Sequence, residues 1–446
     1  MKKLWQKNTT NLAQVEKFTI GEDTKFDLLL APYDVLGSMA HARMLEKVGL
    51  LSAEELKTLQ QGLSEIYQQI AQNAFVIEEG VEDVHSQVEM QLTQLYGEVG
   101  KKLHSGRSRN DQVLVDLKLY YRKAIQEILE KTEALFKLLI QLAETHKNDL
   151  MPGYTHTQLA MPSSFGLWFS ASAESLTEDL DLLYAAFQLA NKNPLGSAAG
   201  YGSSFPLDRS YTTELLGFGD MHHNVMNAQN SRGKTEKHLA FALSALAATL
   251  NKLSADACLF MNQHFAFISF PDELTTGSSI MPHKKNPDVW ELIRAKSNQL
   301  QSVPYQISLL LSNLSSGYHR DLQLLKEAVF PAIENMKDCL DMTHLMLEHI
   351  QVKQDILKAP FYQYVFSVEA VNALVLEGVP FRDAYQSVGQ QIEAGEFKVK
   401  QEVEHTHEGS IGNLCLEAIE EKMEAKLKLF DFAFIEERLE QLKAGG

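Results

Sequence analysis

The sequence predicts a mainly α-helical protein with a long helical bundle at its centre. Three segments carry apolar residues at alternating steps of three and four, which is the spacing of a helix that buries one face. Stretches with the strict alternation of β-strands are scarce, and no internal repeat is evident. The chain has 446 residues, more than one hydrophobic core usually holds, so we expect several domains.

The organisation of the chain follows these segments. Residues 1–105 contain shorter helices joined by polar turns, one of them expected at 53–72, and they form a predicted N-terminal helical domain. Residues 106–352 hold the long periodic segments and form the predicted central bundle domain. Residues 353–446 return to short amphipathic stretches, which predicts a small C-terminal helical domain.

The clearest periodic segment is 239–260, in which every seam position is apolar. A second, 117–142, has only Thr132 at a seam position that should be apolar, and a third spans 289–314. Each predicts a helix longer than the mean of about 11–12 residues in globular proteins. Such helices pack as a bundle, and any apolar face left over favours association with further subunits.

Composition and charge restrict the partners. The formal net charge of −17 argues against a nucleic-acid or anionic membrane surface, because both need a basic patch. The three cysteines, Cys258, Cys339 and Cys415, are far apart and form no metal or disulfide pattern, which fits a reducing cytoplasm. No apolar stretch has the length of a membrane span or the position of a signal peptide. We therefore expect a cytoplasmic protein without a nucleic-acid or membrane partner.

The most informative loop begins at Gly277 and reads Gly-Ser-Ser-Ile-Met-Pro-His-Lys-Lys-Asn-Pro-Asp. Gly277 allows a sharp turn, and Lys284 and Lys285 bring positive charge. Asn286 as N-cap and Pro287 in the first turn predict a helix start whose free N–H groups attract an anion. A simple capping loop would explain Asn286 and Pro287 but not the paired serines and lysines. The loop therefore predicts an anion-binding site.

A second polar loop begins at Leu103, reads Leu-His-Ser-Gly-Arg-Ser-Arg-Asn-Asp-Gln-Val and leads into the segment 117–142. The guanidinium groups of Arg107 and Arg109, together with Asn110, can hold a carboxylate. A capping loop whose arginines form surface ion pairs explains the same residues equally well. The residues alone leave both interpretations open.

Two further loops carry polar side chains of possible chemical use. Thr155 and His156 lie in a polar turn, where a histidine that titrates near neutrality could move a proton or polarise a carboxylate. A lone histidine is nevertheless more often structural. In the loop that begins at Gly317, Tyr318, Gln323 and Lys326 supply donors for a carboxylate, although a polar turn between helices is the favoured interpretation of that loop in isolation.

Taken together, these four loops resemble the signature segments of the fumarase/aspartase superfamily. The run Gly-Arg-Ser-Arg-Asn-Asp-Gln-Val resembles its argininosuccinate lyase branch, and the resemblance extends from Lys3 to Lys326. It implies a three-domain fumarase/aspartase-like fold, a homotetramer with active sites shared between chains, and no metal or organic cofactor. It also implies cleavage of argininosuccinate into arginine and fumarate, a reaction of arginine biosynthesis. Another fumarate-releasing lyase, of the adenylosuccinate or aspartate type, and a non-catalytic structural relative are the alternatives.

The resemblance also assigns roles. Ser278 is the expected general base, Lys284 and Asn286 bind the carboxylate whose charge grows, and His156 organises the proton relay or protonates the leaving guanidinium. The remaining expected substrate contacts are Arg109, Asn110, Thr155, Tyr318, Gln323 and Lys326.

A few positions either depart from the family pattern or match it without an expected catalytic role. His283 stands where this branch usually has Gln, and Thr24 or the Gly21 backbone is expected to replace a serine contact near the N-terminus. His85 also matches the family pattern, and we expect it to have a structural partner.

Overall fold

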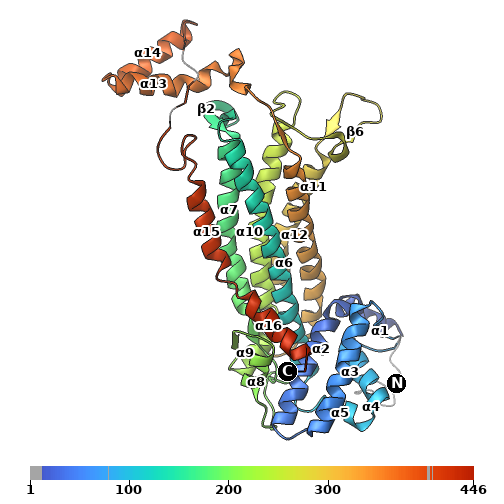
Figure 1. Cartoon of the computed structure of the whole chain (residues 1–446). Helices are drawn as coiled ribbons and strands as arrows, with labels where there is room; N and C mark the ends of the chain where they lie inside the picture. The colour runs from blue at the N-terminus through green and yellow to red at the C-terminus, as the bar shows by residue number, and fades with distance from the viewer. Residues whose placement is uncertain (1–12, 79, 399–401, 404, 446) are drawn as a thin grey trace.

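The computed structural model describes residues 13–78, 80–398, 402–403 and 405–445. It is mainly α-helical, as predicted. Within this part of the chain, five long helices lie side by side as an elongated bundle (Figure 1): α6 (Arg109–Thr145), α7 (Phe165–Ala190), α10 (Lys234–Phe260), α11 (Asp288–Leu310) and α12 (Leu325–Glu348). No described helix combines the length and the hydropathy needed to cross a membrane.

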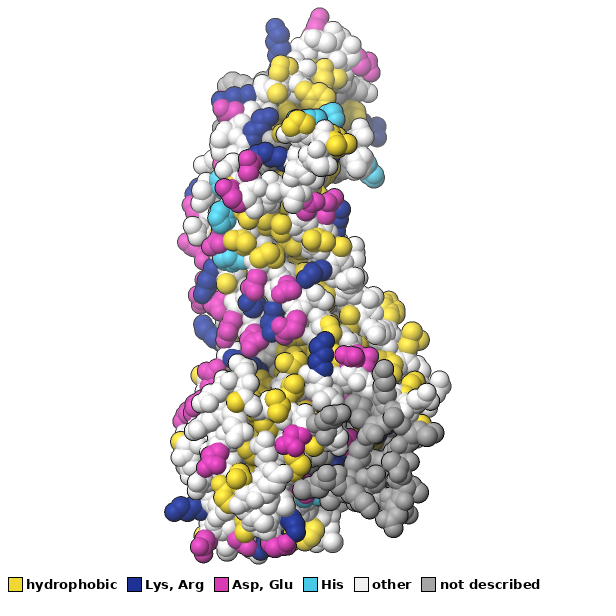
Figure 2. Space-filling view, turned by 90° about the vertical axis from the view of Figure 1, so that its right-hand side faces the viewer, with side chains coloured by type: hydrophobic (Ala, Val, Ile, Leu, Met, Phe, Trp, Pro, Cys, Tyr) yellow, Lys and Arg dark blue, Asp and Glu magenta, His cyan; other side chains and the backbone are white. Residues whose placement is uncertain are grey.

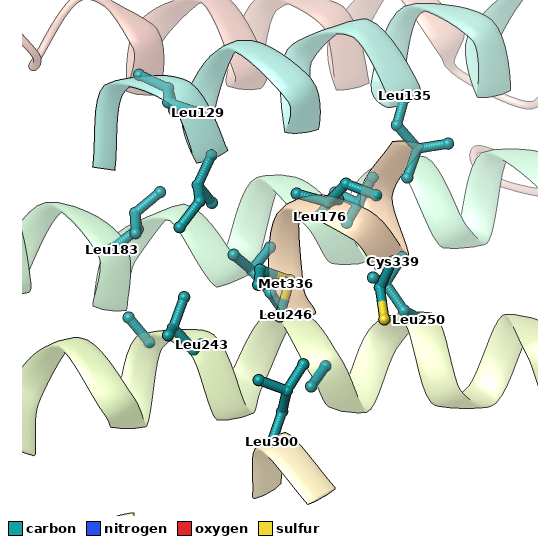
Figure 3. Packing of buried hydrophobic residues seen from close by; sticks show 14 of the residues in the cluster. Leu129, Leu135, Leu176, Leu183, Leu243, Leu246, Leu250, Leu300, Met336 and Cys339 are labelled. Atoms are coloured by element: carbon teal, nitrogen blue, oxygen red, sulfur yellow. The ribbon is translucent and has the colours of Figure 1, made fainter. Parts of the chain in front are cut away.

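The predicted seams form the core of this bundle. All seam residues of the segment 239–260 are buried in α10, and Thr132 is buried at its expected place in α6. The hydroxyl of Thr132 donates to the Ile128 carbonyl oxygen at 2.7 Å, so this polar group is satisfied within its own helix. Figure 3 shows leucines of α6, α7 and α10 meeting Met336 and Cys339 of α12. The third seam is shorter than predicted, because α11 ends at Leu310.

The N-terminal part of the chain packs at one end of the bundle (Figure 1). Its helices are α1 (Ala13–Ile20), α2 (Asp23–Lys47), α3 (Ala53–Ala71), α4 (Val84–Tyr96) and α5 (Glu98–Lys102). The helix predicted at 53–72 is α3, and a capping box fixes its start: the Glu55 N–H donates to Ser52 Oγ at 3.2 Å, and the Ser52 N–H donates to Glu55 Oε2 at 2.9 Å.

Short strands and helices connect the long helices. An antiparallel hairpin of β1 (Leu150–Thr155) and β2 (Gln158–Ser164) follows α6. β3 (Lys192–Asn193) pairs with β4 (Asp220–Met221), β5 (Ile268–Ser269) with β8 (Gln351–Val352), and β6 (Thr276–Gly277) with β7 (Lys285–Asn286). The short helices are α8 (Arg209–Leu215), α9 (Val225–Asn230) and the 3-10 segments Asp272–Leu274, Arg320–Leu324, Ile356–Lys358 and Pro360–Phe366.

The C-terminal part contains α13 (Ser367–Leu376), α14 (Phe381–Glu393), α15 (Leu416–Leu427) and α16 (Phe432–Lys443). α13 and α14 share a small apolar cluster of their own at the end of the molecule away from α2. α15 then runs back along α7, and α16 reaches α2 (Figure 1). The domain limits at 105 and 352 stay a prediction.

Candidate active site

A pocket of about 170 Å³ lies where the first helices meet the bundle. Its walls are formed by the starts of α2, α4 and α6, by the turn before α10, and by the start of α12 with the segment before it. We call it the proximal pocket, and its wall includes the predicted residues Arg109, Asn110, Tyr318, Gln323 and Lys326. Folding therefore brings together two loops that are about half the chain apart in sequence.

The positive groups of the proximal pocket are already paired with acids of the same chain. Lys326 is 3% exposed, and its Nζ lies 2.5 Å from Asp23 Oδ1 and 2.7 Å from Asp27 Oδ1. Arg109 Nη1 lies 3.0 Å from Glu82 Oε2 and 3.1 Å from Asp83 Oδ2. A substrate carboxylate that binds here must therefore compete with these acids or add to the charge network.

Two other donors in the proximal pocket contact the N-terminal helix α1. Arg320 Nη2 and Gln323 Nε2 both donate to the Thr19 carbonyl oxygen at 3.0 Å. Tyr318 is exposed and Asn110 is half-buried. Arg107, the second guanidinium of its loop, donates instead to Ser38 Oγ at 3.0 Å and is not part of the pocket wall.

Sequence reasoning missed Arg232, which also lines the proximal pocket. Arg232 immediately precedes Gly233, the N-cap of α10, and is 6% exposed. Gly233 has a φ of +83°, and a Cβ at this position would lie 2.2 Å from Leu311 Cδ2, so only glycine fits. The Gly-x-x-Glu spacing at this helix start was a readable capping signal, but nothing in the sequence linked Arg232 to the other loops.

A buried ion cluster adjoins the proximal pocket, and its histidine, His85, is part of the pocket wall. His85 Nδ1 is 2.9 Å from Asp34 Oδ1 and 3.6 Å from Asp116 Oδ2. Burial disfavours charge on the imidazole, but the two carboxylates outweigh it and raise the pKa of His85 to about 10. These three side chains could geometrically hold a metal ion, yet a protonated imidazole has no lone pair to donate at neutral pH. His85 thus has the structural partner that we expected.

The other predicted residues lie on two loops at the opposite end of the bundle (Figure 1). We call residues 155–157 and 278–284 the distal loops. Thr155 and His156 are exposed at the tip of the β1–β2 hairpin. His156 and Thr157 have φ of +52° and +62°, the left-handed pair of a two-residue hairpin turn. This turn holds the imidazole in solvent at the very end of the hairpin.

The second distal loop connects β6 and β7. Ser278 Oγ accepts from the Ile280 N–H at 3.4 Å and from the Met281 N–H at 3.2 Å. Lys284 Nζ contacts Asn286 Oδ1, so a cation and an amide lie together in the hairpin that carries the serine. The loop thus combines a hydroxyl, two backbone donors and a cation.

The predicted helix start after this loop is wrong by one residue. The N-cap of α11 is Pro287, which makes no side-chain cap bond, and Asn286 belongs to β7. The Asn286 amide donates to Thr276 Oγ1 at 3.3 Å across the hairpin. The Asn286 side chain therefore bonds across the hairpin to β6 and does not form the cap of α11 that the sequence predicted.

The two groups of predicted residues are far apart within one chain. α6 has 37 residues, which corresponds to roughly 55 Å at 1.5 Å per residue. Arg109 and Asn110 begin this helix, while Thr155 and His156 follow its end. No hydrogen bond, ion pair or pocket of the described residues joins the proximal pocket to the distal loops.

The chain is similar to known lyases along nearly its whole length. The sequence model of a family described as lyase matches residues 2–302. The argininosuccinate lyase of Bacteroides fragilis is 58% identical over 435 residues, which cover 98% of this chain and 97% of that protein. The argininosuccinate lyase of Thermotoga neapolitana is 39% identical and covers 87% of this chain and 98% of that protein.

Solved structures share the fold. A variant of EDDS lyase with bound fumarate has a TM-score of 0.76 at 21% identity and covers 98% of this chain and 95% of that one. The class II fumarase of Schistosoma mansoni has a TM-score of 0.71 at 17% identity, with 94% and 95% covered. At these identities the likeness concerns the fold alone, and it confirms the expected fumarase-like architecture.

Proposed function

We propose, from the premise that this chain belongs to the argininosuccinate lyase family, that it cleaves argininosuccinate reversibly into L-arginine and fumarate by β-elimination. The observation that supports this activity is the similarity to argininosuccinate lyases over nearly the whole chain. Because L-arginine is a product, the proposed reaction belongs to arginine biosynthesis. We also propose that the protein is cytoplasmic. The geometry of the loop around Ser278 supports the chemical step.

The difficult step is removal of a proton from the carbon next to a carboxylate. Such a carbon is a very weak acid unless the dianion that forms is stabilised by donors already in position. We assign the base to Ser278. The N–H groups of Ile280 and Met281, which already point at its Oγ, favour the alkoxide over the hydroxyl.

The neighbouring side chains complete this assignment. Lys284 and Asn286 lie on the same hairpin as Ser278, and they supply the charge and the amide donor for the carboxylate on which negative charge grows. His156 organises the proton relay or protonates the departing guanidinium. The protonated guanidinium leaves as arginine, and the remaining four carbons become fumarate.

The proximal pocket is proposed to hold the rest of the substrate. Arg109, Asn110, Tyr318, Gln323 and Lys326 are its proposed substrate contacts, and Thr155 adds one from the distal loops. The pocket contains both acids and cations, which suits a substrate that carries carboxylates, an ammonium and a guanidinium. Argininosuccinate has all of these groups.

We further propose a homotetramer in which the proximal pocket of one chain meets distal loops of others. The separation of roughly 55 Å along α6 exceeds the length of any such substrate, so one chain cannot close the site alone. Exposed apolar side chains support association: Leu292, Tyr305 and Leu309 on α11 are 62%, 75% and 76% exposed. Figure 2 shows hydrophobic side chains in a band across the bundle on one face.

The activity is tested by fumarate absorbance with purified protein. Absorbance should rise with argininosuccinate and stay at background with adenylosuccinate and aspartate. Release of fumarate only from adenylosuccinate or aspartate would replace the proposed substrate. Absence of turnover with all of them would favour a non-catalytic relative.

Sharing of active sites between chains is tested by mixing two inactive variants, one with a substitution in the proximal pocket and one with a substitution in a distal loop. Asn110→Ala damages the proximal pocket and Ser278→Ala damages a distal loop. If the ends come from different chains, random mixing should restore about one site in four. The control is a mixture of Ser278→Ala with Lys284→Met, whose lesions lie on one loop. Recovery in neither mixture would mean that each site belongs to one chain.

A further inference from the structure

Arg232 differs from the other cations of the proximal pocket, because it is buried and lies in the turn that leads into the bundle helix α10. Two of its contacts are fixed by its own chain. Its Nη2 donates to the Leu322 carbonyl oxygen at 3.0 Å, and its Nε lies 3.3 Å from Glu236 Oε1. The contact with Leu322 is a hydrogen bond, whereas the contact with Glu236 is an ion pair in which Nε makes no hydrogen bond. A guanidinium is planar and has five N–H donors, so the two contacts together restrict the direction of the others.

Glu236 is itself held rigidly. It is 1% exposed, its Oε2 accepts the Gly233 N–H at 2.6 Å, and its Oε1 accepts the Tyr121 hydroxyl at 3.3 Å. Burial and the neighbouring Glu236 raise the pKa of Tyr121, so the phenol stays protonated and remains a donor. The Glu236 carboxylate is therefore fixed by Tyr121 of α6 and by Gly233 at the start of α10, and it keeps its position if the Arg232 side chain moves.

The remaining Nη1 group of Arg232 makes no hydrogen bond to any residue that the structure describes. Since Arg232 lines the proximal pocket, this unused end of the guanidinium is available to a ligand there. Arg109 and Lys326 differ in this respect, because acids inside the pocket already pair with them. The ion-pair partner of Arg232 is Glu236, which is not part of the pocket wall, although the charge of Arg232 also acts on Asp23 in that wall.

We propose that Glu236 is a positioning residue for the lyase reaction, holding Arg232 so that its free edge receives a carboxylate of argininosuccinate. This inference rests on the proposed function. The negative charge matters as well as the shape, because an arginine buried without an anion nearby would turn toward the acids of the pocket. Tyr121 acts one step further back, through Glu236.

A purely structural role for Glu236 makes a different prediction. Its bond to the Gly233 N–H is a helix cap, and loss of a cap lowers stability without changing substrate affinity. A positioning role changes the affinity for argininosuccinate, and it does so only while Arg232 is present. The two roles therefore separate in a double-mutant cycle.

The cycle consists of the wild type, Glu236→Gln, Arg232→Met and the double variant. Glutamine keeps the size and an acceptor for Gly233 but removes the charge. We expect Glu236→Gln to raise KM for argininosuccinate about tenfold with kcat within about threefold, because a charge-assisted contact is weakened. In the Arg232→Met background the same change should leave KM unaltered. A further tenfold rise there would overturn the proposal.

A second variant covers the case in which Glu236→Gln does not fold. Tyr121→Phe removes only the hydroxyl, and it should raise KM about two- to threefold in the wild type and not at all in Arg232→Met. Equal effects in both backgrounds would also overturn the proposal. Thr235→Val is the matched control, since Thr235 Oγ1 accepts from Lys118 at 3.2 Å in the same helical turn but does not contact Arg232.

The binding half of the cycle is independent of turnover. In a Ser278→Ala background, argininosuccinate should bind without reacting, and calorimetry gives its Kd for each member of the cycle. Loss of affinity on Glu236→Gln that requires Arg232 supports the positioning role even if the wild type does not release fumarate. A wild type that does not release fumarate would refute the proposed function but not the positioning role of Glu236.

Discussion

The proximal pocket and the distal loops differ in how their side chains are held. In the proximal pocket, Lys326 is buried between Asp23 and Asp27, and each partner comes from a helix. In the distal loops, Ser278 is half-buried and held by two backbone N–H groups, while His156 is exposed and held by a tight turn. The first arrangement contributes to folding, while the second leaves reactive groups accessible. Stability and chemistry are therefore expected to respond to different substitutions.

The largest effect on activity is expected in a distal loop. Ser278→Ala should lower kcat and kcat/KM together by roughly 10²–10⁴-fold, because a general base acts only in the transition state. Substrate affinity by calorimetry and the melting temperature should hardly change. Ser279→Ala is the matched control and should cost less. Near-normal turnover in Ser278→Ala, or a greater loss in Ser279→Ala, would remove the base assignment.

The largest effect on stability is expected in the proximal pocket. Lys326→Met leaves the buried Asp27 and the half-buried Asp23 without their cation, so the free energy of unfolding should fall by about 3 kcal/mol. Lys284→Met, at an exposed lysine of a distal loop, should change it by no more than about 0.5 kcal/mol. Urea unfolding of both variants measures the difference. Equal losses would contradict the contrast between the two regions.

The ion cluster of His85, Asp34 and Asp116 at the proximal pocket should make stability depend on pH. Because the pKa of His85 rises from 6.5 to about 10 on folding, its contribution is complete below pH 6.5 and is lost as the pH rises toward 10. The slope is about 1.4 kcal/mol per pH unit. Urea unfolding of the wild type and of His85→Gln between pH 6 and pH 10 tests this. The difference between their free energies of unfolding should become smaller as the pH rises. A constant difference would mean that His85 is not charged in the folded protein.

The smallest expected effect is a gain in stability at a distal loop. Thr157 is β-branched and has a φ of +62°, a conformation that glycine adopts without strain. Thr157→Gly should therefore raise the free energy of unfolding by about 0.5–1 kcal/mol. Thr155→Gly is the control, because Thr155 lies in β1, where glycine weakens the strand. A loss in Thr157→Gly would show that the hairpin tip is not strained.

Much of the fold was predictable because its signals are periodic. The seams of α6 and α10 repeat over many turns, so even Thr132 was correctly placed in the core. The β1–β2 hairpin was recognised only as a polar turn, since His156 and Thr157 are not residues that usually form such a turn. Local strand pairing likewise displaced Asn286 from its predicted cap.

The site was predictable residue by residue but not as an arrangement. The four loops contain the side chains at both ends of the bundle. Their partners depend on contacts over long sequence distances, such as the ion pair of Lys326 and Asp27, which are 299 positions apart. Arg232 was missed for the same reason, because its role depends on a fold that brings the start of α10 to the proximal pocket.

The length of α6 has a consequence for how such a protein can change over time. If the two ends of one chain serve different catalytic centres, the helix acts as a strut that sets the spacing of those centres. Inserting one heptad would lengthen the 37-residue helix by about 10.5 Å, and α7, α10, α11 and α12 would have to lengthen with it. Substitutions in the terminal loops alter one centre at a time. New substrates are therefore expected to arise by changes at the ends of the bundle, while its length stays constant.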